Sequence, residues 1–172
     1  MIPFQSHAVS GVALSRFDGQ YKILMMKRTK GNYWCHVAGG IEEGEAGWQT
    51  IVREFAEETQ INVETLYNGQ YLEQFYQVKS DSIVNIPVFV VYCDDNQVIT
   101  LNDEHTEYRW CDLEQAKSLA EFPGKKRCMI MFGNTLSYAA LQRSHAFHSI
   151  DSELNASIKV WTDWMRHLAN GL

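Results

Sequence analysis

The sequence predicts one α+β domain in which a mixed sheet lies between helices, as in an α/β/α sandwich. Two observations carry this prediction. Segments with the spacing of strands lie both before and after a segment with the spacing of a helix, and further helical segments close the chain. With 172 residues, 45% of them hydrophobic, the chain is also long enough to bury its own core.

The first predicted elements are a hairpin and a short strand. Residues 7–17 and 20–28 are apolar runs on either side of Asp18-Gly19, a pair that tolerates positive φ and favours a tight turn. Residues 33–38 then form a short strand that leads into the pair Gly39-Gly40. Two glycines permit a backbone conformation closed to other residues and let the main chain approach a ligand.

Residues 46–59 have the spacing of an amphipathic helix. Its semi-apolar face is formed by residues at steps of four, three and four, namely Trp48, Val52, Phe55 and Thr59. Glu54, Glu57 and Glu58 lie three and four residues apart, so the helix gathers three carboxylates on another face. Each close pair of like charges costs up to ~0.5 kcal/mol on an isolated helix, so this crowding needs a physical explanation.

The rest of the chain is predicted to complete the sheet and then to close with helices. Strands are expected at 62–78 and 82–93, and Pro87 indicates an edge position or a bulge in the second. The later elements are short strands at 97–100 and 107–110, a helix from Asp112 or Leu113 to Ala120 with Asp112 as N-cap, a helix at about 125–144 and a last helix at 151–170.

Composition argues against several classes of protein. No apolar run approaches the ~18 residues of a membrane span, and the N-terminus has no secretory pattern, so we expect a cytoplasmic protein. The mild net charge of −6, without a basic patch, argues against duplex nucleic acid as a partner. The scattered cysteines show no zinc-type spacing and are predicted to be buried reduced thiols: Cys35, Cys93, Cys111 and Cys128.

The negative charge is concentrated in residues 39–61. This segment holds six glutamates and one arginine, a formal charge of −5 in a chain whose total is −6. A solvated helix face, with Arg53 relieving some repulsion, would account for it. The alternative is a hard cation such as Mg²⁺, which prefers oxygen ligands, polarises phosphoryl oxygens and acidifies water. With a glycine-rich turn that could cradle phosphate, the segment indicates metal-assisted cleavage of a phosphoanhydride.

The spacing of this segment resembles the Nudix box, G-x5-E-x7-R-E-U-x-E-E-x-G-U. The matching positions are Gly39, Glu45, Arg53, Glu54, Phe55, Glu57, Glu58 and Ile61. The order of elements over about 7–145 also resembles the Nudix α/β/α sandwich. The resemblance implies a single Nudix domain over 1–172, with 151–170 as a helical extension. It also implies an enzyme that uses Mg²⁺ or Mn²⁺ to hydrolyse a nucleoside diphosphate linked to a further group.

The resemblance assigns roles by position. The implied metal ligands are Glu54, Glu57 and Glu58, and one of the last two would act as the base that activates water. Arg53 would orient the glutamates, with Glu45 as its partner. Many family members place a further ligand or base on a loop, and Glu104 is the candidate here, against the alternative of a solvated loop acid.

Two positions depart from the family pattern. Gln60 occupies the position of the last glycine of the box. This position is at a helix end, where a left-handed backbone favours glycine, so the loop could close differently. The residue before the glycine pair, often proline in the family, is Ala38, which is expected to loosen the turn without changing the chemistry.

The substrate is indicated only loosely. The runs WCHVAGGIEEGE and EHTEYRWCDL, with the missing box glycine, resemble the dATP/dihydroneopterin triphosphate pyrophosphohydrolase branch. This favours a (deoxy)nucleoside or dihydroneopterin triphosphate cleaved to a monophosphate and pyrophosphate. The alternatives are a dinucleoside polyphosphate, a nucleotide sugar, or a non-hydrolytic regulator that binds nucleotides, the last disfavoured because all three box carboxylates are present.

Several residues are candidates for substrate contact. Gly39, Gly40 and Arg28 could bind phosphate, with Lys125, Lys126 and Arg127 as weaker candidates. Trp34 could stack on a ring, as could Tyr33, Phe75 and Tyr76, although a core role is the alternative for each. The expected partner is thus a small nucleotide-like molecule. The apolar stripe of the predicted helix at 151–170 either covers the sheet or contacts a second copy, so a homodimer stays open.

Overall fold

The computed structural model describes residues 1–135 and 146–149. The strands are β1 (Phe4–Gln5), β2 (Ala8–Phe17), β3 (Gln20–Arg28), β4 (Trp34–Cys35), β5 (Val37–Gly40), β6 (Thr65–Gln77), β7 (Ser82–Tyr92), β8 (His105–Cys111) and β9 (Ala146–Ser149). The helices are α1 (Gly47–Thr59), the 3₁₀ turn η1 (Val78–Ser80), α2 (Leu113–Leu119) and α3 (Pro123–Thr135).

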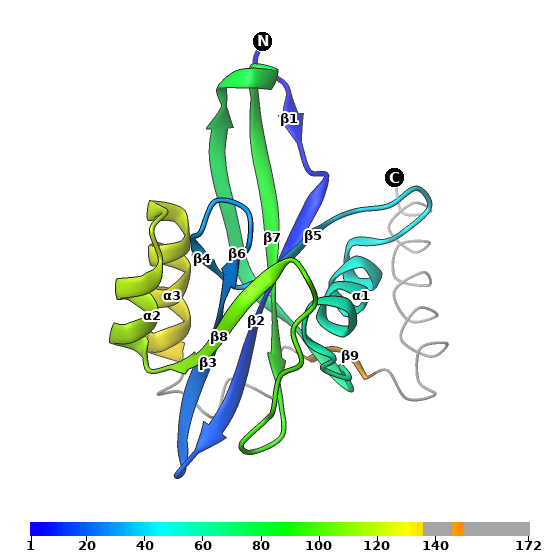
Figure 1. Cartoon of the computed structure of the whole chain (residues 1–172). Helices are drawn as coiled ribbons and strands as arrows, with labels where there is room; N and C mark the ends of the chain where they lie inside the picture. The colour runs from blue at the N-terminus through cyan, green and yellow to red at the C-terminus, as the bar shows by residue number, and fades with distance from the viewer. Residues whose placement is uncertain (136–145, 150–172) are drawn as a thin grey trace.

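The described strands form one mixed sheet with helices on both faces (Figure 1), which confirms the predicted α+β sandwich. Along its main path the strand order is β4-β3-β2-β7-β6-β9. β2 pairs with β7 in parallel and with β3 in antiparallel orientation. Off this path, β1 pairs with β7, β5 pairs with β2 and β8 pairs with β3.

The core has two halves, one on each face of the sheet, because β2 is buried on both sides. Val9 and Ala13 pack in the cluster that includes Phe55 of α1. Val12 and Leu14 point the other way, into the cluster that includes residues of α2 and α3. This alternation is the period of two expected of a strand. Among the described helices, α1 covers one face of the sheet, and α2 and α3 cover the other (Figure 1).

Local chemistry explains the elements that were predicted well. Asp18 and Gly19 adopt positive φ, 50° and 79°, in the turn between β2 and β3. Asp112 caps α2 by accepting a hydrogen bond from the backbone N–H of Gln115. Pro87 lies between the β7 residues that pair with β1 and those that pair with β2, where its missing N–H is tolerated.

Three parts of the sheet differ from the prediction. The strand expected over 33–38 is split at His36 into β4, which pairs with β3, and β5, which pairs with β2. The strand expected over 97–100 is absent from the described structure, because the N–H of Gln97 donates to the Ser15 hydroxyl and that of Thr100 to the carbonyl of Thr59. The short strands β1 and β9 were not predicted.

The predicted helix at 125–144 is described as α3 up to Thr135, and its remainder lies outside the described residues. The predicted helix at 151–170, with its apolar stripe and its use in a homodimer, lies outside them as well. No helix in the described part of the chain is long and apolar enough to cross a membrane. Of the four cysteines, Cys93 is half-buried and the others are buried, and all are free thiols.

Gln60 does adopt the left-handed conformation, with φ 58° and ψ 21°, and its N–H donates to the carbonyl of Ala56. The helix therefore ends in the left-handed geometry that glycine favours. A non-glycine residue there costs about 1–2 kcal/mol, and glycine returns part of that through the greater entropy of its unfolded state. We expect Gln60→Gly to stabilise the protein by about 0.5–1 kcal/mol in urea unfolding. Gln60→Ala, which keeps the strain, should not; equal gains from both would contradict this assignment.

Candidate active site

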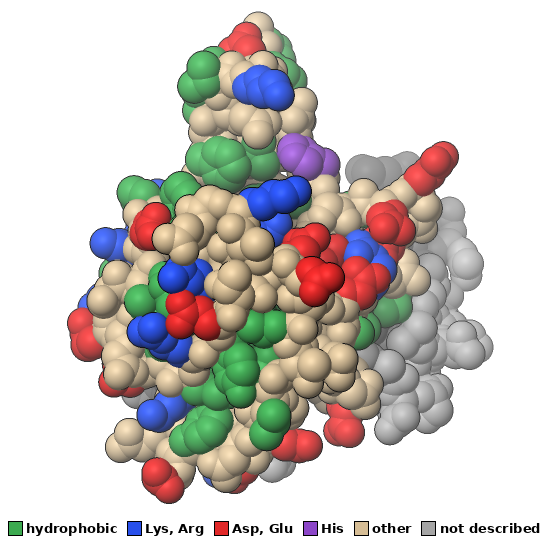
Figure 2. Space-filling view, viewed as in Figure 1, with side chains coloured by type: hydrophobic (Ala, Val, Ile, Leu, Met, Phe, Trp, Pro, Cys, Tyr) green, Lys and Arg blue, Asp and Glu red, His purple; other side chains and the backbone are tan. Residues whose placement is uncertain are grey.

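The predicted acidic and arginine residues of the site converge beside α1. Acidic side chains gather with Lys and Arg side chains over α1 and the loop before it (Figure 2). α1 supplies Glu54, Glu57 and Glu58, while Arg28 at the end of β3 reaches Glu58 and the loop residue Glu104. Segments far apart in the chain are thus brought to one place by the sheet, as the family resemblance implies.

Arg53 holds the acidic residues in position. Its Nε and Nη2 donate to the two carboxylate oxygens of Glu45, each at 3.0 Å. Its Nη1 donates to Glu54 at 2.7 Å and to Glu57 at 3.2 Å. Its Nη2 also donates to the carbonyl oxygen of Gly40 at 3.1 Å. The planar guanidinium therefore fixes three carboxylates relative to β5, which fits the orienting role predicted for it.

The Arg53 guanidinium, ahead of smaller contributions, lowers the pKa of Glu45 to about 2. Burial is the largest influence on Glu54 and raises the pKa of that carboxyl, although Arg53 works against it. Glu45 is thus a permanently charged anchor for Arg53. In the absence of a metal ion, the charged form of Glu54 is less favoured than that of Glu45.

The glycine pair lies in β5 and not in a turn, and neither glycine has positive φ. Gly39 is required for a different reason. A Cβ built on Gly39 would lie 1.9 Å from Oε1 of Glu54, whereas one on Gly40 would lie 3.9 Å from its nearest neighbour. The sequence predicted that a ligand would approach the backbone at the glycine pair, but in the structure the Glu54 side chain does so at Gly39. Contact of either glycine with phosphate stays a prediction.

Glu58 is the most unusual of these acids, because its side chain is only 3% exposed. One oxygen lies 3.5 Å from Nη1 of Arg28, and the N–H of Ala38 donates to the carboxylate. The other oxygen, Oε2, is buried without a hydrogen-bond partner among the described residues. Burial first, and then the charge of Glu54, raise the pKa of Glu58 to about 8. A buried carboxylate without a full set of partners is costly unless a cation joins it.

Arg28 and Glu104 form the other side of the acidic cluster. Nη1 of Arg28 lies 2.7 Å from Oε2 of the exposed Glu104, and the Glu104 carbonyl accepts from the N–H of Thr29. Arg28 thus bridges Glu58 and Glu104, and is engaged by carboxylates instead of standing free for phosphate. The structure brings Glu104 close to the box, and its role as a ligand or base stays a prediction.

The aromatic candidates are less favourably placed for stacking. Trp34 is 8% exposed within the core, and the guanidinium of Arg109 covers its ring at 4.7 Å. Tyr33 packs edge-on against Phe122. Phe75 and Tyr76 are exposed near the end of β6, a strand whose end projects from the body of the molecule with β7 (Figure 1). The core alternative is therefore favoured for Trp34.

The NUDIX domain family matches residues 6–131 of this sequence. The chain belongs to the NUDIX family. This membership confirms the resemblance found in residues 39–61, and with it the predicted class of enzyme, a hydrolase of phosphoanhydrides. Specific substrates do not follow from membership alone, since one fold supports many functions.

Curated relatives and solved structures agree with the assignment. The chain is 29% identical to the asymmetrical bis(5′-nucleosyl)-tetraphosphatase of Mus musculus over 150 residues, which cover 86% of this NUDIX chain and 91% of the relative. Its fold is similar to that of a C. elegans Ap4A hydrolase in a binary complex (TM-score 0.67, 22% identity, 76% of this chain and 97% of the other). It is also similar to that of the E. coli dihydroneopterin triphosphate pyrophosphohydrolase (TM-score 0.66, 21% identity, 78% and 99%).

One polar cluster of this NUDIX domain escaped prediction. His36, Glu73 and Cys128 meet under α3, although the sequence places them far apart. Zinc-type spacing is a pattern of cysteines and histidines that lie close together in the sequence. It cannot reveal ligands that come from separate strands and a helix, as these three do.

Proposed function

We propose that this chain is a divalent-cation-dependent pyrophosphohydrolase that acts on nucleoside polyphosphates. The observation that carries the proposal is the buried, incompletely paired carboxylate of Glu58 beside Glu54. The pKa values of both carboxyls are raised, and a cation bound between them would favour the charged form of each. Carboxylate oxygens are also the donors that Mg²⁺ and Mn²⁺ prefer.

The residues that would hold the ion are Glu54, Glu57 and Glu58. When bound, Mg²⁺ would polarise a phosphoryl oxygen and lower the pKa of water. Arg53 keeps Glu54 and Glu57 aimed at the site through its hydrogen bonds. Glu57 is 56% exposed and so accessible to water, whereas Glu58 is buried, and one of these two would accept the proton from the attacking water.

Two substrate classes are supported by different observations. The asymmetrical bis(5′-nucleosyl)-tetraphosphatases match along most of both chains, which favours a dinucleoside tetraphosphate. The sequences around the box, WCHVAGGIEEGE and EHTEYRWCDL, favour a nucleoside or dihydroneopterin triphosphate. The fold is compatible with this substrate class, since it is similar to that of a dihydroneopterin triphosphate pyrophosphohydrolase. We place the dinucleoside tetraphosphate first because its support extends over more of the chain.

A product assay tests the proposal. The protein with Mg²⁺ is given diadenosine tetraphosphate, nucleoside triphosphates, dihydroneopterin triphosphate and nucleotide sugars. We expect asymmetrical cleavage of the dinucleotide to ATP and AMP. Release of pyrophosphate from a triphosphate at a higher kcat/KM would instead support the second candidate. Nucleotide binding without hydrolysis of any of these compounds would contradict the proposal and favour a regulator.

A further inference from the structure

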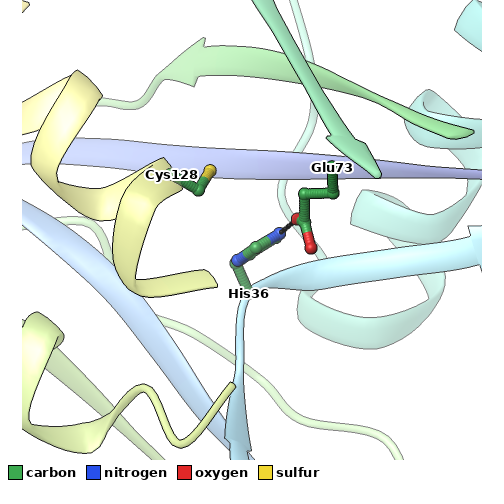
Figure 3. Close-up of side chains that lie close together, drawn as sticks. All are labelled: His36, Glu73 and Cys128. Atoms are coloured by element: carbon green, nitrogen blue, oxygen red, sulfur yellow. Dashed lines mark ion pairs between the residues drawn. The ribbon is translucent and has the colours of Figure 1, made fainter. Parts of the chain in front are cut away.

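A second group of metal-binding side chains lies away from the box. His36 lies at the junction of β4 and β5, Glu73 comes from β6 and Cys128 from α3. The side chains of His36 and Glu73 face each other, and Cys128 lies close by (Figure 3). One ligand atom from each lies within 4.8 Å of the other two. All three residues are buried, His36 to the extent of 1% exposure.

The contact between His36 and Glu73 is short but poorly aligned for a hydrogen bond. Nε2 of His36 lies 2.9 Å from Oε1 of Glu73. Despite this distance, neither ring nitrogen of His36 has an aligned hydrogen-bond partner among the described residues. A buried polar group left in this state costs about 1–3 kcal/mol. Two ligands of one metal ion show the same combination of short separation and poor alignment, because their lone pairs point at the ion and not at each other.

We propose that His36, Glu73 and Cys128 bind one Zn²⁺ ion. Imidazole, carboxylate and thiolate are the donors that zinc uses in proteins, and the thiolate and imidazole would not suit Mg²⁺. Binding would release the Cys128 proton to solvent. The thiolate and the Glu73 carboxylate would then balance the charge of the ion, so the buried site is neutral overall. Three protein ligands leave one position of a tetrahedral ion for a small ligand such as water.

The surrounding groups favour the ligand form of His36 and Glu73, whereas burial raises the pKa of the Cys128 thiol, so the ion must displace its proton. Burial and the nearby charge of Lys125 lower the pKa of His36, which keeps its ring in the neutral form that binds metal. Burial opposes ionisation of Glu73, but the contact with the His36 ring and the charge of Lys125 favour its carboxylate form and lower its pKa to about 2. The Ser10 hydroxyl donates to Oε1 of Glu73 at 3.3 Å, an outer contact of the kind that orients a ligating carboxylate.

The ion would have a structural role. It would join β6, α3 and the β4–β5 junction on the sheet face that α2 and α3 cover, whereas α1 and its acids lie on the other face. β5 links the two sites, since Ala38, two residues after His36, donates its N–H to Glu58. The proposal does not depend on hydrolytic activity, because it concerns ligands outside the box.

The test is binding of Zn²⁺ and of Co²⁺, its spectroscopic substitute, to the metal-free full chain. We expect one tightly bound Zn²⁺ per chain in addition to weaker binding by the box carboxylates, a rise in Tm of about 5 °C with saturating Zn²⁺, and a near-ultraviolet thiolate-to-Co²⁺ charge-transfer band. The acids of the box contain no sulfur, so this band reports only on a cysteine. Cys128→Ser should remove the band and weaken Zn²⁺ binding by at least about 100-fold.

Cys111→Ser is the matched control, because Cys111 is another buried thiol in the same core cluster and is not part of the trio. It should keep both the band and the affinity. His36→Gln provides a second loss variant if Cys128→Ser does not fold. A wild-type chain without the charge-transfer band, or a folded Cys128→Ser or His36→Gln variant with wild-type Zn²⁺ affinity, would overturn the proposal.

Discussion

Glu58→Gln is expected to abolish most hydrolysis and, at the same time, to stabilise the metal-free protein. The loss follows from the removal of a metal ligand, which is worth several kcal/mol of transition-state stabilisation or about 10³-fold in kcat/KM. The gain follows from burial, because a neutral amide replaces a carboxyl whose pKa burial raises to about 8. Loss of function with a gain in stability separates a functional carboxylate from one that supports the fold.

The gain should depend on pH with a defined sign. An acid whose folded pKa is raised above its ordinary value of 4.5 binds its proton more strongly in the folded state. The loss of stability caused by burying this carboxyl is therefore absent below about pH 4.5 and grows until the pH passes about 8. The difference in unfolding free energy between Glu58→Gln and wild type should rise across this window by up to ~5 kcal/mol, at about 1.4 kcal/mol for each pKa unit. Urea unfolding in chelator at several pH values measures it, and the comparison cancels the titration of the histidines.

Glu57→Gln is the matched control for this experiment. Glu57 is the neighbouring acid of the same helix but is largely exposed, so its neutralisation should reduce hydrolysis without a comparable gain in stability. Wild-type rates in both variants on the best substrate would show that these glutamates are not the metal ligands. Equal stability changes in both would show that burial of Glu58 is not the cause.

Gly39→Ala is expected to damage the site by displacing Glu54. The added methyl group would overlap the Glu54 carboxylate, which cannot retreat freely because Arg53 holds it. A displacement of about 1 Å at a catalytic site can cost ~10²-fold in rate, and overpacking costs about 1–3 kcal/mol in stability. Steady-state kinetics with Mg²⁺ and thermal unfolding measure the two effects.

Gly40→Ala and the double variant Gly39→Ala/Glu54→Ala test whether the loss in Gly39→Ala arises from Glu54. At Gly40 an added Cβ meets only ordinary contacts, so this variant should lose clearly less stability and activity than Gly39→Ala. If Gly39 acts through Glu54, Gly39→Ala should add little to the loss in kcat/KM already caused by Glu54→Ala. Fully additive losses would mean that Gly39 serves another function, such as the contact with phosphate that the sequence suggested.

The features that the sequence predicts well depend on residues close together in the chain. The Asp18-Gly19 turn, the Asp112 cap and the acidic face of α1 each follow from spacing within a few residues. The resemblance of residues 39–61 to the Nudix box extends this to chemistry, including the pairing of Arg53 with Glu45.

Features that depend on tertiary contacts were missed or misread. The glycine pair was expected to form a turn, but the need for Gly39 arises from Glu54, which reaches it from α1. The engagement of Arg28 with Glu58 and Glu104 needs three separate segments. The meeting of His36 with Glu73 and Cys128 has no local signal at all, because the sheet and α3 bring these residues together.

The central claim, that the acids of α1 bind a divalent cation, is tested most directly by titration of the chain with Mn²⁺. Bound Mn²⁺ loses the sharp electron paramagnetic resonance signal of the free ion. We predict saturable loss of this signal for the wild-type chain, competition by Mg²⁺, and at least about 10-fold weaker binding by Glu58→Gln. Equal Mn²⁺ binding by wild type and Glu58→Gln, or no binding by either, would contradict the assignment.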